Sequence, residues 1–111
     1  MLPAASGAAP GRFTGEVTDA LRTPTHRLAA GAGANGRASA DLVFADAQHA
    51  RTRARTCVRR RDVAGVRTCF DVTTAAAGVA TVTPLRFRRG SYVVTWRVAG
   101  ALVASWRFTV T

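Results

Sequence analysis

The C-terminal stretch RRGSYVVTWRVAGALVASWRFTVT, residues 88–111, contains two runs in which apolar and polar residues alternate. A period of two residues predicts half-buried β-strands, and the Gly-containing link AGA at 99–101 favours a hairpin between them. Each buried aromatic side chain removes roughly 150 to 250 Å² from water, so this pair should supply the largest part of the core. The residues predicted to face inward are Tyr92, Val94, Trp96 and Val98 in the first run and Leu102, Ala104, Trp106, Phe108 and Val110 in the second.

Shorter alternating runs precede this pair, and no apolar set recurs at helical spacing for long enough to predict a helix. The run 37–45 should direct Ala38, Ala40, Leu42 and Phe44 inward. Pro84 should end the pairing of its strand, because it has no amide hydrogen to donate. The other predicted strands are 12–18, a short one within 26–30, 55–61, 65–72 and 78–85, with a turn at GAGANG, 31–36.

Strand number and spacing predict an all-β chain, folded as an antiparallel two-sheet immunoglobulin-like sandwich of about seven strands. Residues 12–111 should form this one domain. Residues 1–11 are mostly Ala, Gly, Pro and Ser, a composition that buries too little apolar surface to fold, so we expect a flexible leader there.

The segment FRRGSYVVTWRV, residues 87–98, resembles the penultimate strand of bacterial immunoglobulin-like and fibronectin-type-III-like sandwiches. The resemblance implies that Gly90 permits the corner before this strand and that the Tyr92 hydroxyl bonds to nearby backbone. The same tail is similar to the last two strands of the bacterial copper resistance protein C family. The His and Met ligands of that family have no counterpart here, where the linking loop is AGA, so no copper site is implied.

Cys57 and Cys69 lie symmetrically about Val63. If the two strands around them form a hairpin centred there, the cysteines face each other at the roughly 4.5 to 5.5 Å Cα separation that suits a disulfide. We therefore predict a disulfide, which would stabilise the domain by about 3 kcal/mol and indicates an oxidising compartment. The alternatives are two reduced cysteines in a cytosolic protein, or a zinc site completed by His26 and His49.

The basic residues are all arginine, 16 in number, and give a net charge of +10 that attracts polyanions. The predicted hairpin places a stripe of them on or near one edge of the sandwich, where they either neutralise phosphates or protect the edge from unwanted strand pairing. Edge protection is favoured, since the aromatics lie on apolar ladders and do not interleave with the arginines. The stripe is Arg51, Arg53, Arg55, Arg59, Arg60, Arg61 and Arg67; Arg86, Arg88 and Arg89 form a second, looser cluster with the same two interpretations.

Catalysis has little support, because the chain has no nucleophile elbow, no phosphate-cradling loop and only one glutamate. Asp41 and Asp46 are expected to be solvated loop carboxylates, and His26 and His49 surface residues. No apolar run is long enough to predict a membrane-spanning helix. We expect neither enzyme activity nor a cofactor nor a metal.

The sequence thus predicts an exported structural or partner-binding module, secreted or at the cell surface. Its partner would be another protein or an anionic surface polymer. The alternative is an arginine-driven binder of polyanions, either nucleic acid, which is not favoured, or a cell-wall phosphate polymer.

Overall fold

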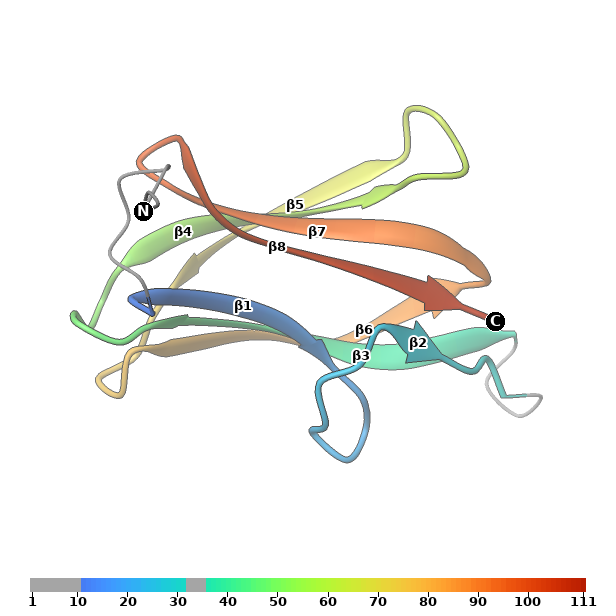
Figure 1. Cartoon of the computed structure of the whole chain (residues 1–111), viewed down its shortest axis with the longest axis horizontal. Helices are drawn as coiled ribbons and strands as arrows, with labels where there is room; N and C mark the ends of the chain where they lie inside the picture. The colour runs from blue at the N-terminus through green and yellow to red at the C-terminus, as the bar shows by residue number, and fades with distance from the viewer. Residues whose placement is uncertain (1–10, 32–35) are drawn as a thin grey trace, which may run out of the picture.

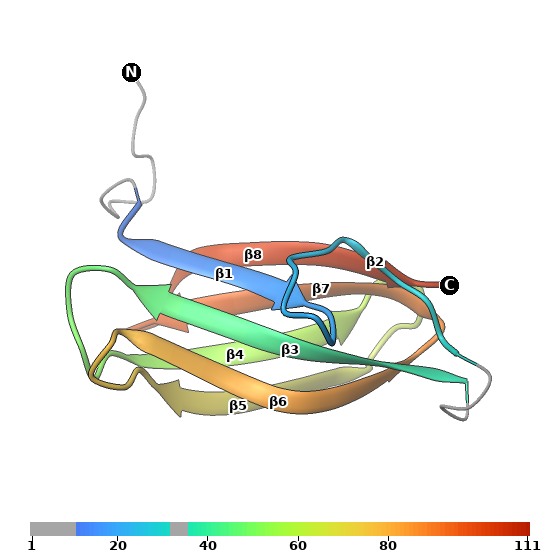
Figure 2. The ribbon, with the colours of Figure 1, turned by 90° about the horizontal axis from the view of Figure 1, so that it is seen from below.

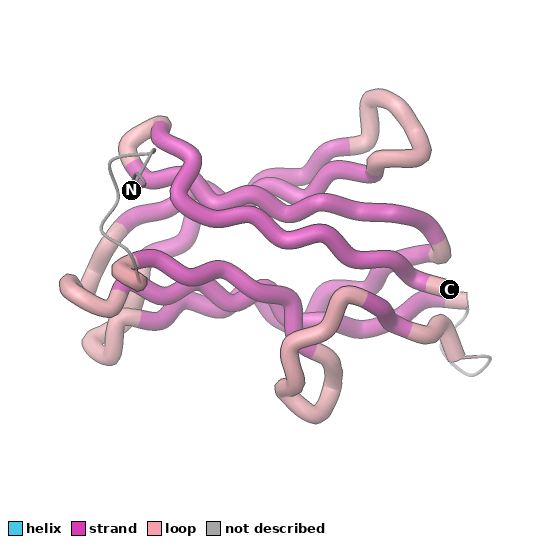
Figure 3. Tube along the Cα trace, in the orientation of Figure 1, coloured by secondary structure: helices cyan, strands magenta, loops and turns pink. Residues whose placement is uncertain are grey.

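The computed structural model describes residues 11–31 and 36–111, and within these ranges it contains eight strands and no helix (Figure 3). The predicted leader 1–11 and the turn 31–36 fall mostly outside the described residues. The described residues include no helix suited to crossing a membrane. The strands are β1 (Phe13–Thr18), β2 (Arg27–Leu28), β3 (Arg37–Asp46), β4 (Arg53–Arg60), β5 (Arg67–Thr73), β6 (Val79–Arg88), β7 (Gly90–Val98) and β8 (Ala101–Val110).

The strands form two sheets that pack as a sandwich, seen edge-on in Figure 1. One sheet has the order β1-β3-β6, and the other has the order β2-β8-β7-β4-β5. The short strand β2 runs parallel to β8, and the remaining neighbours are antiparallel. Figure 2 shows β1, β3 and β6 in front of the larger sheet. The predicted all-β, two-sheet sandwich is confirmed.

The core lies between the sheets and is built from the alternating residues that the sequence directs inward. Trp96 and Val94 of the larger sheet and Leu42 and Phe44 of the smaller one are at most 1% exposed. Tyr92, Phe87 and Phe108 pack as an aromatic trio, with ring centroids 5.0 to 5.2 Å apart. Because apolar side chains fill one face of each sheet, the charged side chains are left to the outer faces and the rim.

A β-bulge in β8 overturns the predicted inward position of Leu102. Trp96 pairs with Ala104 but its neighbour Arg97 pairs with Leu102, which leaves Val103 without a partner on β7. One extra residue exchanges the two faces of a strand from that point on. Val103 therefore packs on the core, and Leu102 is 44% exposed.

A second bulge overturns the prediction that Pro84 ends its strand. β6 continues to Arg88, because two of its residues, Thr83 and Pro84, lie opposite the single residue Asp41 of β3. A bulge releases one residue from the ladder, so proline can stand there without breaking the sheet.

The corner between β6 and β7 is fixed by Gly90 and Tyr92. Gly90 has a φ of +153°, and a Cβ on it would come within 2.5 Å of the Arg60 guanidinium. The Tyr92 hydroxyl donates a 2.6 Å hydrogen bond to the backbone carbonyl of Arg88. This is the kind of backbone bond that the resemblance implies for Tyr92.

Replacing Tyr92 with phenylalanine should lower the free energy of unfolding by about 1 to 2 kcal/mol. The ring and its packing are kept, but the part-buried hydrogen bond to the Arg88 carbonyl is lost. Urea denaturation at neutral pH measures this difference, with the denaturant slope m expected to stay unchanged. An unfolding free energy equal to that of the parent chain would show that the corner does not depend on the hydroxyl.

Candidate functional site

Cys57 and Cys69 form a disulfide, as the sequence predicts. The two residues are direct partners in the β4–β5 ladder, and their Cα atoms are 4.1 Å apart. Both sulfur atoms are committed to this bond. The alternatives of two reduced cysteines and of a zinc site with thiolate ligands are therefore wrong.

The strand that carries most of the predicted arginine stripe is not at an edge. β4 pairs with β5 on one side and with β7 on the other, so it lies inside the five-stranded sheet. The stripe consequently divides between the two faces of the sheet and its loops. Arg53, Arg55 and Arg59 point outward, whereas Arg60 lies on the opposite face and Arg51 and Arg61 lie beyond the strand ends.

We call the outward set the arginine face of the five-stranded sheet. Directly opposed residues share a face, so the ladder places the side chains in transverse rows. The row through Arg59 holds Arg67 on β5 and Arg107 on β8, with Val93 between Arg59 and Arg107. A second row, through Arg55, joins Arg97 on β7 to Asp71 on β5. The arginine face comprises Arg53, Arg55, Arg59, Arg67, Arg97 and Arg107, all of them exposed.

Positive charge on the arginine face is only weakly compensated by acidic residues. Asp71 is the one carboxylate in the two rows of the arginine face. It approaches Arg55 at 3.8 Å, and both side chains are largely exposed. Arg59 and Arg67, and likewise Arg55 and Arg97, are direct cross-strand partners. Like charges in such positions destabilise a sheet. The disulfide lies in the row between them and holds β4 to β5 despite this repulsion.

Arg60 is held in place at the end of the sandwich. Its guanidinium makes two hydrogen bonds to Asp62, at 3.1 and 2.9 Å, and a third to the carbonyl of Arg89 at 3.2 Å. It also lies over the Tyr92 ring, 5.6 Å from the centroid. The hydrogen bond to Asp62 raises the pKa of Arg60, and the same bond lowers the pKa of Asp62.

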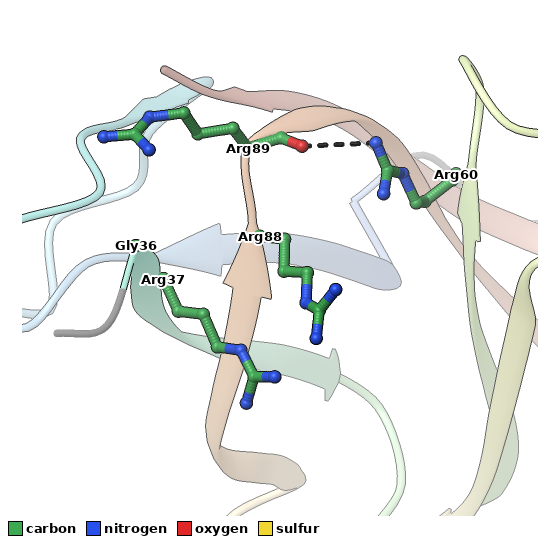
Figure 4. Close-up of a pocket in the computed structure, with 5 residues that line it drawn as sticks. All are labelled: Gly36, Arg37, Arg60, Arg88 and Arg89. Atoms are coloured by element: carbon green, nitrogen blue, oxygen red, sulfur yellow. Dashed lines mark hydrogen bonds between the residues drawn. The ribbon is translucent and has the colours of Figure 1, made fainter.

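A cavity of about 530 Å³ opens beside Arg60 and gathers four arginines from three parts of the chain (Figure 4). Arg37 and Arg88 are direct partners in the β3–β6 ladder. Figure 4 shows these two side chains extending the same way, whereas Arg89 points away from Arg60. The sequence predicts a cluster at Arg88 and Arg89 but misses Arg37, since only the long-range β3–β6 register brings it there. The lining residues are Gly36, Arg37, Arg60, Arg88 and Arg89.

A second cavity, of about 520 Å³, shares Arg37, Arg60 and Arg88 with the first and continues between β5 and β6. We call the two together the basic groove. The hairpin loop joining β4 and β5 rises away from the smaller sheet in Figure 1, which leaves this edge open. Thr68 and Phe70 are ladder partners of the buried Val58 and Thr56, yet Thr68 is exposed and Phe70 only half-buried. Apolar groups on the wall are Val58, Val66, Phe70, Leu85 and Phe87.

No protein-family model matches the sequence, and no curated protein matches it. Two solved structures are similar over 89% of this chain. The alkylpurine DNA glycosylase AlkC of Pseudomonas fluorescens, bound to DNA containing an abasic site analog, is 13% identical with a TM-score of 0.49. This chain covers only 30% of that chain's length. The CARDB domain of a Pyrococcus furiosus protein in complex with di-metal ions is 9% identical with a TM-score of 0.47, and 87% of it is covered.

Asp46 is not the solvated loop carboxylate that the sequence predicts. Its side chain is fully buried at the end of β3, where Arg12 donates to both oxygens at 3.2 and 3.3 Å. The Thr52 hydroxyl donates at 2.6 Å, and the amides of Gln48 and His49 at 3.0 and 3.2 Å. Burial on its own raises the pKa of Asp46, but these hydrogen bonds together hold it well below its usual range. Through these hydrogen bonds, the Asp46 carboxylate fixes the conformation of the loop between β3 and β4.

The two histidines are exposed, yet each has a partner. His26 stacks on the Trp106 ring at 3.9 Å and donates from Nδ1 to the carbonyl of Arg107 at 2.6 Å. His49 accepts a 3.2 Å hydrogen bond from Arg12 through Nδ1. In the described part of the chain, no three His, Cys, Asp or Glu residues come together as a metal site would need.

Proposed function

We propose that this chain is a non-catalytic, extracytoplasmic binding module that holds an anionic polymer across its arginine face. The two arginine rows lie roughly 13 Å apart along a strand, with the disulfide row between them, and neighbouring strands lie roughly 5 Å apart. Such spacing offers repeated guanidinium groups to a chain of phosphates. A cavity of about 400 Å³ beside Arg53, Arg55 and Arg97 adds depth to one end of the face.

The position of β4 inside its sheet carries the proposal. Charged residues on an edge strand are explained by the need to prevent edge-to-edge pairing. That explanation does not extend to Arg55 and Arg59, because both residues pair with β5 on one side and with β7 on the other. Placing like charges opposite one another also costs stability. Binding of a negatively charged partner gives this arrangement a purpose, since an anion turns the repulsion into attraction.

The absence of aromatic side chains on this face favours a phosphate polymer over a nucleic acid. Proteins that bind single-stranded nucleic acids stack bases on exposed aromatics. Among the described residues, those in the two arginine rows that are not charged are Val93 and Leu102. The indole of Trp106 lies against His26 and donates to the carbonyl of Thr25, away from the face. Recognition through charge alone suits a cell-wall phosphate polymer.

The disulfide supports the extracytoplasmic part of the proposal. Disulfides persist mainly in oxidising compartments, and this one braces the two strands that contribute Arg59 and Arg67. An exported domain of net charge +10 would meet anionic surface polymers directly.

The test compares two double variants of equal net charge for binding to linear polyphosphate. Changing Arg59 and Arg67 to glutamine should weaken binding at least about tenfold at low salt. It should also lower the salt slope of log K by about 1.5 to 2, because two phosphate contacts are lost. Changing Arg22 and Arg51 to glutamine, two exposed arginines outside both the arginine face and the basic groove, should leave both quantities close to those of the parent chain. Fluorescence anisotropy over a salt series measures both.

Unfolding cannot account for the expected loss, since removing two opposed like charges should leave the free energy of unfolding equal or slightly higher. Equal losses in both double variants would mean that net charge alone attracts the polymer, and the chain would then be a structural module. Tighter binding to single-stranded DNA than to polyphosphate would replace the proposed polymer with nucleic acid.

A further inference from the structure

We propose that the basic groove binds a small amphiphilic anion, with a phosphate or carboxylate head among the arginines and an apolar body between β5 and β6. This site lies at the edge of the sandwich where β5 and β6 face each other, whereas the arginine face lies on the outer surface of the larger sheet. The inference therefore does not rest on the proposed function.

The head end of the groove has positive charge that the described residues leave uncompensated. Arg37 and Arg88 are opposed across the β3–β6 ladder, and neither forms an ion pair with any described residue. Asp62 is engaged by Arg60 through both of its oxygens. An anionic head placed between Arg37 and Arg88 would relieve their repulsion and could accept paired hydrogen bonds from planar guanidinium groups.

Arg60 gives the head end a rigid wall. Its side chain is only 21% exposed and is fixed by Asp62, by the Arg89 carbonyl and by the Tyr92 ring. Gly90 is needed for this arrangement, because a Cβ there would displace the guanidinium. A charge held in place before the ligand arrives loses little conformational entropy on binding.

The body end of the groove is mainly apolar and open to solvent, although Thr68 and Arg86 also line it. Val66 is 45% exposed, and Phe70 is half-buried on the edge strand β5, so both retain apolar surface that a ligand could cover. Leu85 and Phe87 of β6 form the opposite wall. The volume of about 520 Å³ lies within the range of small-molecule sites. Apolar walls beside an arginine cluster match a ligand that carries both characters, whereas a bare phosphate would use only the head end.

Octyl phosphate is a suitable probe, used below its micellar concentration and followed by calorimetry. The parent chain should bind it measurably tighter than it binds either inorganic phosphate or octanol. Changing Arg88 to glutamine should weaken octyl phosphate binding about tenfold through lost charged hydrogen bonds. This variant keeps the Arg88 carbonyl that Tyr92 uses. Changing Phe70 to serine should weaken binding by roughly five- to tenfold through lost apolar contact.

Val66→Ser supplies a second test of the apolar wall, because Val66 lies in the exposed loop where a substitution does not threaten the strand. The matched control is Arg67→Gln, one residue along but on the outer face, which should bind octyl phosphate as the parent does. Polyphosphate binding should in turn be unchanged by Arg88→Gln. The proposals for the arginine face and for the basic groove can therefore be contradicted independently of each other. Equal octyl phosphate affinity in the parent and in Arg88→Gln would overturn the inference. Octanol or inorganic phosphate binding as tightly as octyl phosphate would also overturn it.

Discussion

Replacing Gly15 with alanine should lower the free energy of unfolding by about 3 kcal/mol, although the change adds a single methyl group. A Cβ built on Gly15 lies 2.3, 2.6 and 2.7 Å from Cε3, Cζ3 and Cδ2 of Trp96. Trp96 is fully buried and cannot turn away without displacing its neighbours. Chemical denaturation with intrinsic fluorescence would measure the loss, because the same indole reports on the fold.

The steric origin of this loss can be separated from the backbone effect of removing a glycine. Gly15 does not adopt a positive φ, so alanine at an unobstructed strand position would be favoured by about 0.5 to 1 kcal/mol. Gly31→Ala is the matched control, since nothing lies within 4 Å of its Cβ position, and its unfolding free energy should stay equal or rise by up to about 1 kcal/mol. Combining Gly15→Ala with Trp96→Phe should cost about 1 to 2 kcal/mol less than the sum of the single changes. Strict additivity would contradict a direct clash.

Alternation of apolar residues predicts which side chains fill the core, but not how the strands are offset. The positions of Trp96, Val94 and Phe44 follow from a period of two, because a strand has only two faces. The contact between Gly15 and Trp96 joins strands far apart in sequence and leaves no local signal beyond a glycine in a strand pattern. The exposure of Leu102 depends on a bulge, and one extra residue reverses a face without changing the composition of the run.

The cysteine pair is predicted correctly because its geometry is local. A hairpin closed by a short turn fixes which residues face each other, and so Cys57 and Cys69 could be paired from their spacing alone. The neighbour of β4 on its other side is β7, which is more than thirty residues away in sequence. The sequence does not show the β4–β7 pairing, so it predicts that the arginines of β4 lie at an edge of the sandwich. Protection of that edge is then the favoured interpretation, although β4 has a neighbouring strand on each side.

The basic groove could be predicted only in part, for the same physical reason. Adjacent arginines such as Arg88 and Arg89 stand out in the sequence, whereas Arg37 is a single basic residue in an alternating run. The β3–β6 register brings Arg37 beside Arg88 at the site. Arg60 can lie against the corner between β6 and β7 because Gly90 has no Cβ there. The sequence shows that arginines are frequent near residues 86–89. Only the pairing of strands far apart in the sequence shows which arginines line the same cavity.

Replacing Asp46 with asparagine should lower the free energy of unfolding at pH 7 by about 2 to 4 kcal/mol. The amide keeps the size of the carboxylate, but it loses the charge and turns an NH₂ donor toward Arg12 or Thr52, which are themselves donors. Buried donors left without an acceptor are costly. The matched control is Asp71→Asn, where the carboxylate is 83% exposed and pairs with Arg55 at 3.8 Å, so a change below about 1 kcal/mol is expected.

The Asp46 contribution should also depend on pH in a defined direction. The pKa of Asp46 is lower in the folded protein than the roughly 3.9 of an unfolded chain, so the folded state binds fewer protons. Stability from this carboxylate is therefore complete above about pH 5 and decreases as the pH falls through 4 toward the folded pKa. The difference in unfolding free energy between the parent and Asp46→Asn, measured from pH 7 to pH 3, should accordingly narrow as the pH falls below about 4. A constant difference over that range would show that the charge of Asp46 contributes nothing and that only the shape of its side chain matters.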